Sequence, residues 1–337
     1  MGGFLGFLYR QLTFKPKPLP PTISLAGNTG LITGANIGLG FEAARELASH
    51  KLSRLILAVK DTSKGETAKT TFSKESPDCD VQVWQLDYDS YESMVAFGAK
   101  VATLDRLDYV LLNAGLKQVT YTASHTGHET NVQINHIGTS LLSLLILPTL
   151  QKTAKQTGKP SRMTIVSSEG HFWTPFKERN APNILARLDE RETFGRVMQR
   201  YYTSKLLNVF WTRELASRVD RSEVIINTPN PGWCYSGLHR YQMTSLYNLV
   251  LKMLSWTSAQ GGHCLVDALV LHEESHGQYL SEQKETSYAM SLRYTDCLLL
   301  TMSYIADLRT LFFPRKAKRF RRNSGARRWI CWKRRYF

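Results

Sequence analysis

The chain has 337 residues, of which 42% are hydrophobic, and this length suffices for one large core or two domains. The formal net charge is +15, but residues 315–337 contain 11 Lys or Arg and no acid, so the remainder carries only +4. This distribution argues against nucleic-acid binding by the folded body. The five cysteines lack metal-ligand spacing, so we expect no metal site, and free thiols in a reducing cytoplasm.

By composition, residues 1–24 form a lead-in to the main fold. Residues 3–12 are too short and too weakly flanked for a signal peptide, and Gly6 stands where a myristoylation signal needs Ser or Thr. We interpret this stretch as a short surface helix or docking segment. Residues 15–21 hold four prolines and predict an extended connection.

From residue 25 onward, strand-like and helix-like runs alternate. Buried strands are expected at residues 31–32, 55–59, 81–86, 109–112, 163–166, 224–226 and 278–280. Helices are expected at residues 41–49, 127–150 and 202–219. This alternation predicts an α/β fold: a Rossmann-like, doubly wound parallel sheet in a single domain over residues 25–283. Ligands of such sheets bind beyond the carboxyl ends of the strands.

A glycine-rich turn follows the first expected strand. It contains Gly34, Asn36, Ile37, Gly38, Leu39 and Gly40 and opens a predicted helix. Glycine lets backbone N–H groups approach a pyrophosphate, and the helix dipole favours its negative charge. The spacing TGxxxGxG differs from the common dinucleotide fingerprint, so this turn predicts a phosphate cradle only together with further landmarks.

Charged residues end the next two strands. Lys60 stands where a cation meets the 2′-phosphate of NADP, whereas an acid there would favour NAD; the alternative is a solvated surface lysine. Asp87 is a candidate acceptor from the adenine amino group or, alternatively, a helix cap. Asn113, Ala114 and Gly115 end the fourth strand, where small residues let a cofactor pass close to the backbone.

Tyr201 and Lys205 are four residues apart, so on a helix they share one face. A neighbouring lysine lowers the pKa of a tyrosine, which then serves as a general acid or base. Alone, such a pair is more often a surface pair. Ser167 and Ser168 end the fifth strand. Asn135 lies in an apolar helical stretch and is expected to be buried and hydrogen-bonded.

Taken together, these motifs resemble the short-chain dehydrogenase/reductase family, and in particular its retinol-dehydrogenase-like branch and fungal members from specialised metabolism. The resemblance covers residues 25–283 and rests on landmarks in the family's order. They are Thr33-Gly34-x-x-x-Gly38-x-Gly40, Asn113-Ala114-Gly115, Asn135, Ser168, Tyr201-x-x-x-Lys205 and Pro231-Gly232.

The resemblance implies a role for each landmark. Tyr201 would exchange the proton with the substrate oxygen, Lys205 would lower the tyrosine pKa and hold the nicotinamide ribose, and Ser168 rather than Ser167 would polarise the carbonyl. Asn135 would hold a water that links Lys205 to solvent. The resemblance also places Asn36, Ile37, Leu39, Lys60, Asp87, Pro231, Gly232 and Ser236 at the cofactor.

Three segments depart from the family pattern. Residues 169–200 form an insert, either a surface excursion or a substrate wall with Trp173, Phe176 and Phe194 near the site. Residues 233–256 are apolar and aromatic and predict a helical lid or ordinary helix packing. Residues 284–337 form a basic extension that we expect to pack poorly, with membrane-surface contact as the alternative.

These observations lead us to expect an NADP-dependent oxidoreductase, with NAD as the less favoured cofactor, acting on a carbonyl or alcohol of a hydrophobic small molecule. A non-catalytic nucleotide-binding protein of the same fold is the alternative, and intact Ser168, Tyr201 and Lys205 argue against it. A sugar-nucleotide epimerase would favour GxxGxxG in the first turn, which is absent. The sequence leaves the oligomeric state open.

Overall fold

The computed structural model describes residues 3–196, 198–239 and 253–287. Its centre is an eight-stranded sheet in the order β3-β2-β1-β4-β5-β6-β7-β8, in which the β7–β8 pair is antiparallel and the other pairs are parallel. The strands are β1 (Thr29–Thr33), β2 (Arg54–Val59), β3 (Asp80–Gln85), β4 (Tyr109–Leu112), β5 (Ser161–Ile165), β6 (Val224–Pro229), β7 (Tyr279–Ser281) and β8 (Lys284–Thr286). The order reverses direction between β1 and β4, so the predicted doubly wound sheet is confirmed.

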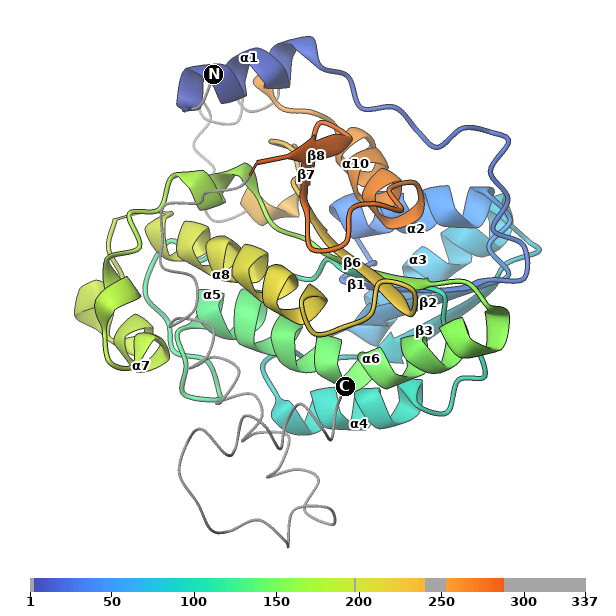
Figure 1. Ribbon diagram of the computed structural model, residues 1–337, viewed down its shortest axis with the longest axis horizontal. Coiled ribbons are helices and arrows are strands. Elements are labelled where there is room, and N and C mark those ends of the chain that lie inside the picture. Colours follow the sequence, from blue (N-terminus) through green and yellow to red (C-terminus); the bar gives the residue numbers. More distant parts are fainter. Residues whose placement is uncertain (1–2, 197, 240–252, 288–337) are drawn as a thin grey trace, which may run out of the picture.

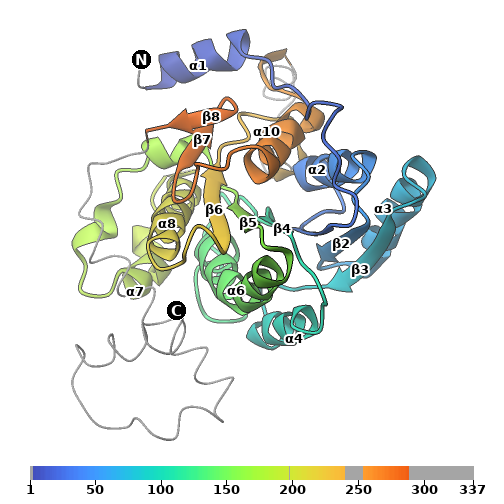
Figure 2. The same ribbon diagram turned by 45° about the vertical axis from the view of Figure 1, so that its right-hand side comes forward.

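Helices cover both faces of this sheet (Figures 1 and 2). One layer consists of α2 (Gly38–Ser49), α3 (Thr62–Glu75) and α10 (Ser258–Val270). The opposite layer consists of α4 (Tyr91–Val101), α6 (Gly138–Thr157) and α8 (Gln199–Ala216). Each layer encloses its own apolar core against the sheet. The other described helical segments are α1 (Phe4–Thr13), α5 (Thr130–Val132), η1 (Gln133–Ile137), η2 (Glu169–Phe172), η3 (Lys177–Asn180), α7 (Ile184–Asp189), η4 (Arg191–Thr193) and η5 (Gly237–His239).

Several boundaries differ from the sequence-based expectations. The long helix expected from residue 127 begins at Thr130 and includes a π-helical turn, η1, before α6. The sheet also continues past the expected domain boundary at residue 283, because β8 forms a hairpin with β7. The two residues of that hairpin turn, Glu282 and Gln283, both have positive φ, a local conformation that composition does not reveal.

The amino-terminal segment forms the expected short helix, α1, and packs on the folded body near β7 and β8 (Figure 1). Phe7 and Gln11 are buried, whereas Leu5 is 80% exposed, so one face of α1 is docked and the other faces solvent. The following proline-rich stretch runs back along the domain. Its Leu19 is buried and donates its backbone N–H to the Glu46 carboxylate.

The insert after β5 folds as a compact excursion. Phe176, Ile184 and Leu188 pack against Leu207 and Phe210 of α8 in a small separate core. In the described part of the chain, none of the helices has the length and hydropathy of a membrane span. Most of the predicted lid (240–252) and nearly all of the basic extension (288–337) lie outside the described residues.

Candidate active site

The glycine turn after β1 has the geometry of a phosphate cradle. Gly34 and Gly38 have φ values of 67° and 63°, in the left-handed region that glycine tolerates best. A Cβ at Gly40 would lie 2.5 Å from the carbonyl oxygen of Gly34, so only glycine fits there. The turn leads into α2, whose N-cap residue Ile37 makes no side-chain cap hydrogen bond. The free N–H groups of this helix end suit an anionic phosphate.

Asn113 holds the glycine turn from the adjacent strand β4. Its side-chain amide donates to the backbone oxygen of Thr33 at 2.9 Å. In return, the Thr33 hydroxyl accepts from the backbone N–H groups of Asn113 and Ala114, each at 3.0 Å. The expected small-residue turn after β4 therefore braces the cradle, and its backbone passes directly beside it.

The two charged residues predicted for the adenosine end lie together. Lys60 Nζ is 3.0 Å from Asp87 Oδ2, and the Lys60 side chain is 68% exposed. Asp87 also accepts from the backbone N–H of Asp89. The capping alternative for Asp87 is wrong, because the N-cap of α4 is Ser90, whose hydroxyl accepts from Ser93 N.

The two groups predicted to contact the substrate oxygen meet at the carboxyl end of β5. The side chains of Ser168 and Tyr201 lie near each other in the wall of one cavity, and the Ser168 hydroxyl lowers the pKa of the Tyr201 phenol. Ser168 is half-buried, whereas Ser167 is 1% exposed and its hydroxyl donates to the backbone oxygen of Lys205 at 2.9 Å. The buried hydroxyl is thus engaged in joining β5 to α8, and Ser168 is the serine available at the site.

Lys205 lies one helical turn beyond Tyr201 on α8. Its Nζ is 5.9 Å from the centroid of the Tyr201 ring and donates to the Val166 backbone oxygen at 3.0 Å. A Cβ at Gly115 would lie 3.5 Å from this nitrogen and 3.0 Å from Asn135 Oδ1. The structure therefore brings the predicted lysine, glycine and asparagine together.

Asn135 lies in the π-helical turn η1, the kind of irregular turn often found at functional sites. It is fully buried, as expected, and its amide group donates to Leu116 O and Ser204 Oγ, while its oxygen accepts from Leu116 N. These bonds fix the loop after β4 to α8. The neighbouring His136 is fully buried and hydrogen-bonded to Asn208.

The electrostatics differ from the simple tyrosine–lysine expectation. Burial raises the pKa of Tyr201 to about 12, and the nearby Ser168 hydroxyl offsets this only in part. Burial also lowers the pKa of Lys205 to about 8. Loss of water therefore dominates at both side chains, and the role of Lys205 in lowering the pKa of Tyr201 stays a prediction.

The loop after β6 covers the glycine turn. A Cβ at Gly38 would lie 3.8 Å from that of Ser236. Gly232, with φ 77°, lies against Trp256, so that a Cβ there would come within 2.3 Å of the indole ring. Pro231 precedes it and lines the same cavity as Ser168 and Tyr201. The predicted residues of this loop thus border both the cradle and the candidate reaction site.

Comparison with known proteins gives this arrangement a family. A model of the short chain dehydrogenase family matches residues 28–171. Short chain dehydrogenase sol3 of Alternaria solani is 59% identical over 283 residues, which cover 84% of this chain and 99% of that protein. This chain belongs to the short-chain dehydrogenase/reductase family. It is accordingly an oxidoreductase.

Other comparisons agree with this assignment. Short chain dehydrogenase virL of Hypocrea virens is 36% identical over 286 residues, covering 82% of each chain. The solved structure of an NADPH-bound carbonyl reductase from chicken fatty liver covers 78% of this chain and all of its own, with a TM-score of 0.59. At 19% identity, this second likeness concerns the fold alone.

In this short-chain dehydrogenase, a cavity of about 600 Å³ opens beside the candidate catalytic residues. Ser168 and Tyr201 lie in its wall. Most of its other lining side chains are apolar: Phe4, Phe7, Leu39, Val119, Trp173, Met198, Pro231, Trp233 and Leu238. A volume of this size accommodates a small organic molecule, and the lining favours a hydrophobic one.

The cavity corrects part of the prediction for the insert. Trp173 lines it, as expected, but Phe176 and Phe194 line a different, smaller pocket of about 250 Å³. Phe176 is instead buried against Ile184 and Phe210, so packing within the insert withdraws it from the site. Aromatic composition alone does not distinguish these two environments.

Two contributions to the site were missed by sequence reasoning. Helix α1 supplies the buried Phe7 and the 58% exposed Phe4 to the cavity wall; the short apolar helix was predicted, but not its partner. Lys117 also lines the cavity, is 2% exposed, and has a pKa lowered to about 8 by burial. Its position two residues after Gly115 was the available signal.

Proposed function

We propose that this enzyme interconverts a ketone or aldehyde and the corresponding alcohol on a hydrophobic small molecule, with NADP(H) as its cofactor. The observation that carries the proposal is that Ser168 and Tyr201 lie together in the wall of a largely apolar cavity. A phenol and a hydroxyl that lie near each other can both hydrogen-bond to one carbonyl or alcohol oxygen.

The cofactor has a matching place in the structure. The uncapped amino end of α2 and the left-handed glycines suit the diphosphate. Lys60 and Asp87 suit the adenosine end, where Lys60 would meet a 2′-phosphate. Gly115 and Lys205 would lie at the nicotinamide ribose. When bound, the nicotinamide supplies or accepts the hydride.

The protein's own side chains bind the substrate oxygen and transfer the proton. Ser168 holds the substrate oxygen, and Tyr201 gives a proton to it in reduction or takes one in oxidation. Lys205 adds positive charge beside the tyrosine, and Asn135 supports the water path that we propose from Lys205 to solvent. The apolar wall excludes bulk water and orients the substrate, which strengthens each polar interaction at the oxygen.

We also propose that the substrate is an intermediate of specialised metabolism. Two fungal relatives, both short chain dehydrogenases, and the hydrophobic cavity support this. The three buried free cysteines of the described residues support a reducing compartment such as the cytoplasm.

The test is turnover by the purified protein with NADPH or NADH and a panel of aromatic and aliphatic ketones. We expect NADPH oxidation with hydrophobic ketones and its loss in Tyr201→Phe. Equal rates in the wild type and Tyr201→Phe would reject the assigned acid. Cofactor binding without turnover of any carbonyl or alcohol would favour the non-catalytic alternative.

A further inference from the structure

The amino-terminal helix α1 borders the candidate active site, although more than 150 residues separate it from Ser168 in the chain. Phe7 is 5% exposed, and its ring lies 5.2 Å from that of Trp173, centroid to centroid, in an edge-on arrangement. Phe4, which is 58% exposed, contacts the same indole at 6.0 Å. All three side chains line the cavity that also holds Ser168 and Tyr201. The docked face of α1 is therefore part of the cavity wall.

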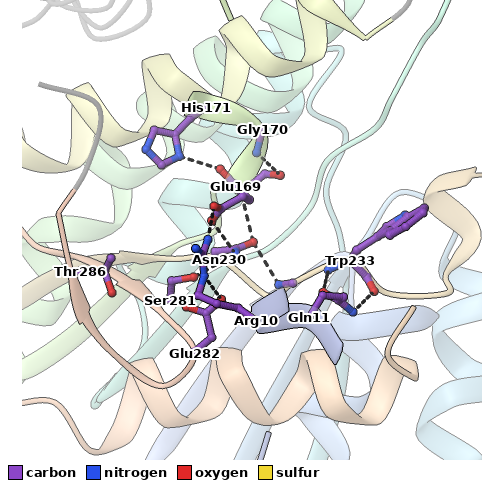
Figure 3. A network of polar contacts seen from close by, with 12 residues as sticks. Arg10, Gln11, Glu169, Gly170, His171, Asn230, Trp233, Ser281, Glu282 and Thr286 are labelled. Atoms are coloured by element: carbon purple, nitrogen blue, oxygen red, sulfur yellow. Dashed lines mark hydrogen bonds and ion pairs between the residues drawn. The ribbon is translucent and has the colours of Figure 1, made fainter. Parts of the chain in front are cut away.

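A network of charged groups holds α1 in this position (Figure 3). The Arg10 guanidinium forms ion pairs with Glu169, which directly follows Ser168, and with Glu282 at 3.2 Å. Both carboxylates are largely buried, with side-chain exposures of 8% and 7%. Burying two neighbouring carboxylates without a cation costs free energy, and the Arg10 guanidinium offsets this cost.

Asn230 extends this network to the loop after β6. Its side-chain oxygen accepts from Glu169 N, and its amide donates to Glu169 Oε2 and to Ser281 Oγ. Tyr279 donates to the same carboxylate oxygen at 3.3 Å. The carboxylate that pairs with Arg10 is thus fixed from the loop after β6 and from strand β7.

A second attachment joins α1 to the other side of the cavity. The Gln11 side-chain amide donates to the backbone oxygen of Trp233 and accepts from its backbone N–H, each at 3.0 Å (Figure 3). The indole of Trp256 donates to the Gln11 backbone oxygen at 2.8 Å. Consequently α1 is bonded to the segment after β5 and to the segment after β6, which both carry candidate site residues.

We infer that α1 forms part of the substrate-binding wall of the active site. Phe7 and Phe4 contact the substrate and limit the size of the molecule that the cavity accepts. Arg10 is the positioning residue that holds these two side chains there. This inference rests on the proposed function for its substrate class. It concerns the identity of the wall, however, and not the chemistry at Tyr201.

Substitutions at Phe7 test the wall directly. With acetone, acetophenone and acetylnaphthalene as ketones of increasing size, Phe7→Ala raises KM for acetylnaphthalene about tenfold, since lost apolar contact of this size costs on that order. Its kcat, and KM for acetone, remain within about twofold of the wild type. Phe7→Trp narrows the cavity and selects against acetylnaphthalene. Leu5→Ala, on the exposed face of the same helix, is the matched control and leaves kcat and KM for all three ketones unchanged.

Arg10 is tested by Arg10→Gln and the conservative Arg10→Lys. Arg10→Gln reproduces the rise in KM of Phe7→Ala and accelerates amide hydrogen exchange across residues 4–13, while Arg10→Lys restores part of both. Unchanged KM and unchanged exchange in Arg10→Gln would overturn the positioning role. Phe4→Ala gives a second variant should Phe7→Ala fold poorly.

Calorimetric binding of acetylnaphthalene separates this inference from the proposed function, because it requires no turnover. A wild type that binds the ketone but never reduces it refutes the proposed function alone, and weaker binding by Phe7→Ala then still supports the wall. Equal binding and equal KM in the wild type, Phe7→Ala and Leu5→Ala refute the wall, whatever the chemistry.

Discussion

Lys60 Nζ lies 3.0 Å from Asp87 Oδ2, so the residues that follow the neighbouring strands β2 and β3 are joined by an ion pair. The Lys60 side chain is 68% exposed, and pairs of this kind contribute between about 0 and 1 kcal/mol to stability. Lys60 can therefore leave Asp87 for a more strongly charged partner. The ammonium can therefore turn to a 2′-phosphate at little energetic cost, leaving Asp87 for the adenosine.

Lys60→Ala should accordingly weaken NADP binding about tenfold, equivalent to about 1.4 kcal/mol, and leave NAD binding unchanged. The shift of the melting temperature with each cofactor measures this, because a ligand stabilises the folded protein more when it binds more tightly. Lys74→Ala, at an exposed position of α3, is the control. An equal loss of both cofactors would show that Lys60 does not read the 2′-phosphate.

Tyr201→Phe should lower kcat by about 10²–10⁴-fold, since it removes the proton-transfer group. Ser168→Ala should have a smaller effect in the same direction, because it removes only a donor to the substrate oxygen. Stopped-flow NADPH absorbance measures both. Tyr121→Phe removes a phenol that donates to the Asp189 backbone oxygen, away from the cavity, and should keep full activity. Comparable losses in Tyr121→Phe and Tyr201→Phe would indicate a general structural effect.

Gly40→Ala should disrupt the cradle. The added Cβ would lie 2.5 Å from Gly34 O and from Asn113 Nδ2, so the turn after β1 must shift. We expect a loss of about 1–3 kcal/mol in the free energy of unfolding, by urea titration, together with loss of cofactor binding. Ser49→Ala, an exposed position near the other end of α2, should affect neither. Full cofactor binding by Gly40→Ala would place the diphosphate elsewhere.

Stability should depend on pH through Lys205. Burial lowers the pKa of its amine to about 8 from an ordinary value of 10.5, so between these values the unfolded chain binds a proton that the folded chain does not. The free energy of unfolding therefore rises with pH in this window, and the gain is lost as pH falls toward about 8.

Replacing this amine isolates its contribution. Lys205→Met should be more stable than the wild type at pH 7, by up to about 3 kcal/mol, and the difference should shrink by pH 10. Urea unfolding of both proteins at the two pH values measures it. Lys74→Met should show no such trend, and a constant difference between Lys205→Met and the wild type would mean that the lysine stays charged in the fold.

Much of the fold was predictable because it is encoded over short distances. The apolar runs near Leu31, Ile56 and Val110 lie in β1, β2 and β4, where they are buried on both faces of the sheet. The glycines of the first turn, and the four-residue spacing of Tyr201 and Lys205, are local patterns whose geometry follows from the strand–turn–helix and helix in which they lie. Their chain order was enough to indicate the family.

The order of residues along the chain was sufficient to predict the alternating elements, the glycine turn and the candidate tyrosine, lysine and serine. The folded structure was needed to show that Arg10 pairs with Glu169, that Phe7 lines the cavity whereas Phe176 does not, and that burial raises the pKa of Tyr201 to about 12. The reason is physical: periodicity and turn chemistry depend on near neighbours, whereas contacts across the fold and the loss of water depend on the packing of the entire chain.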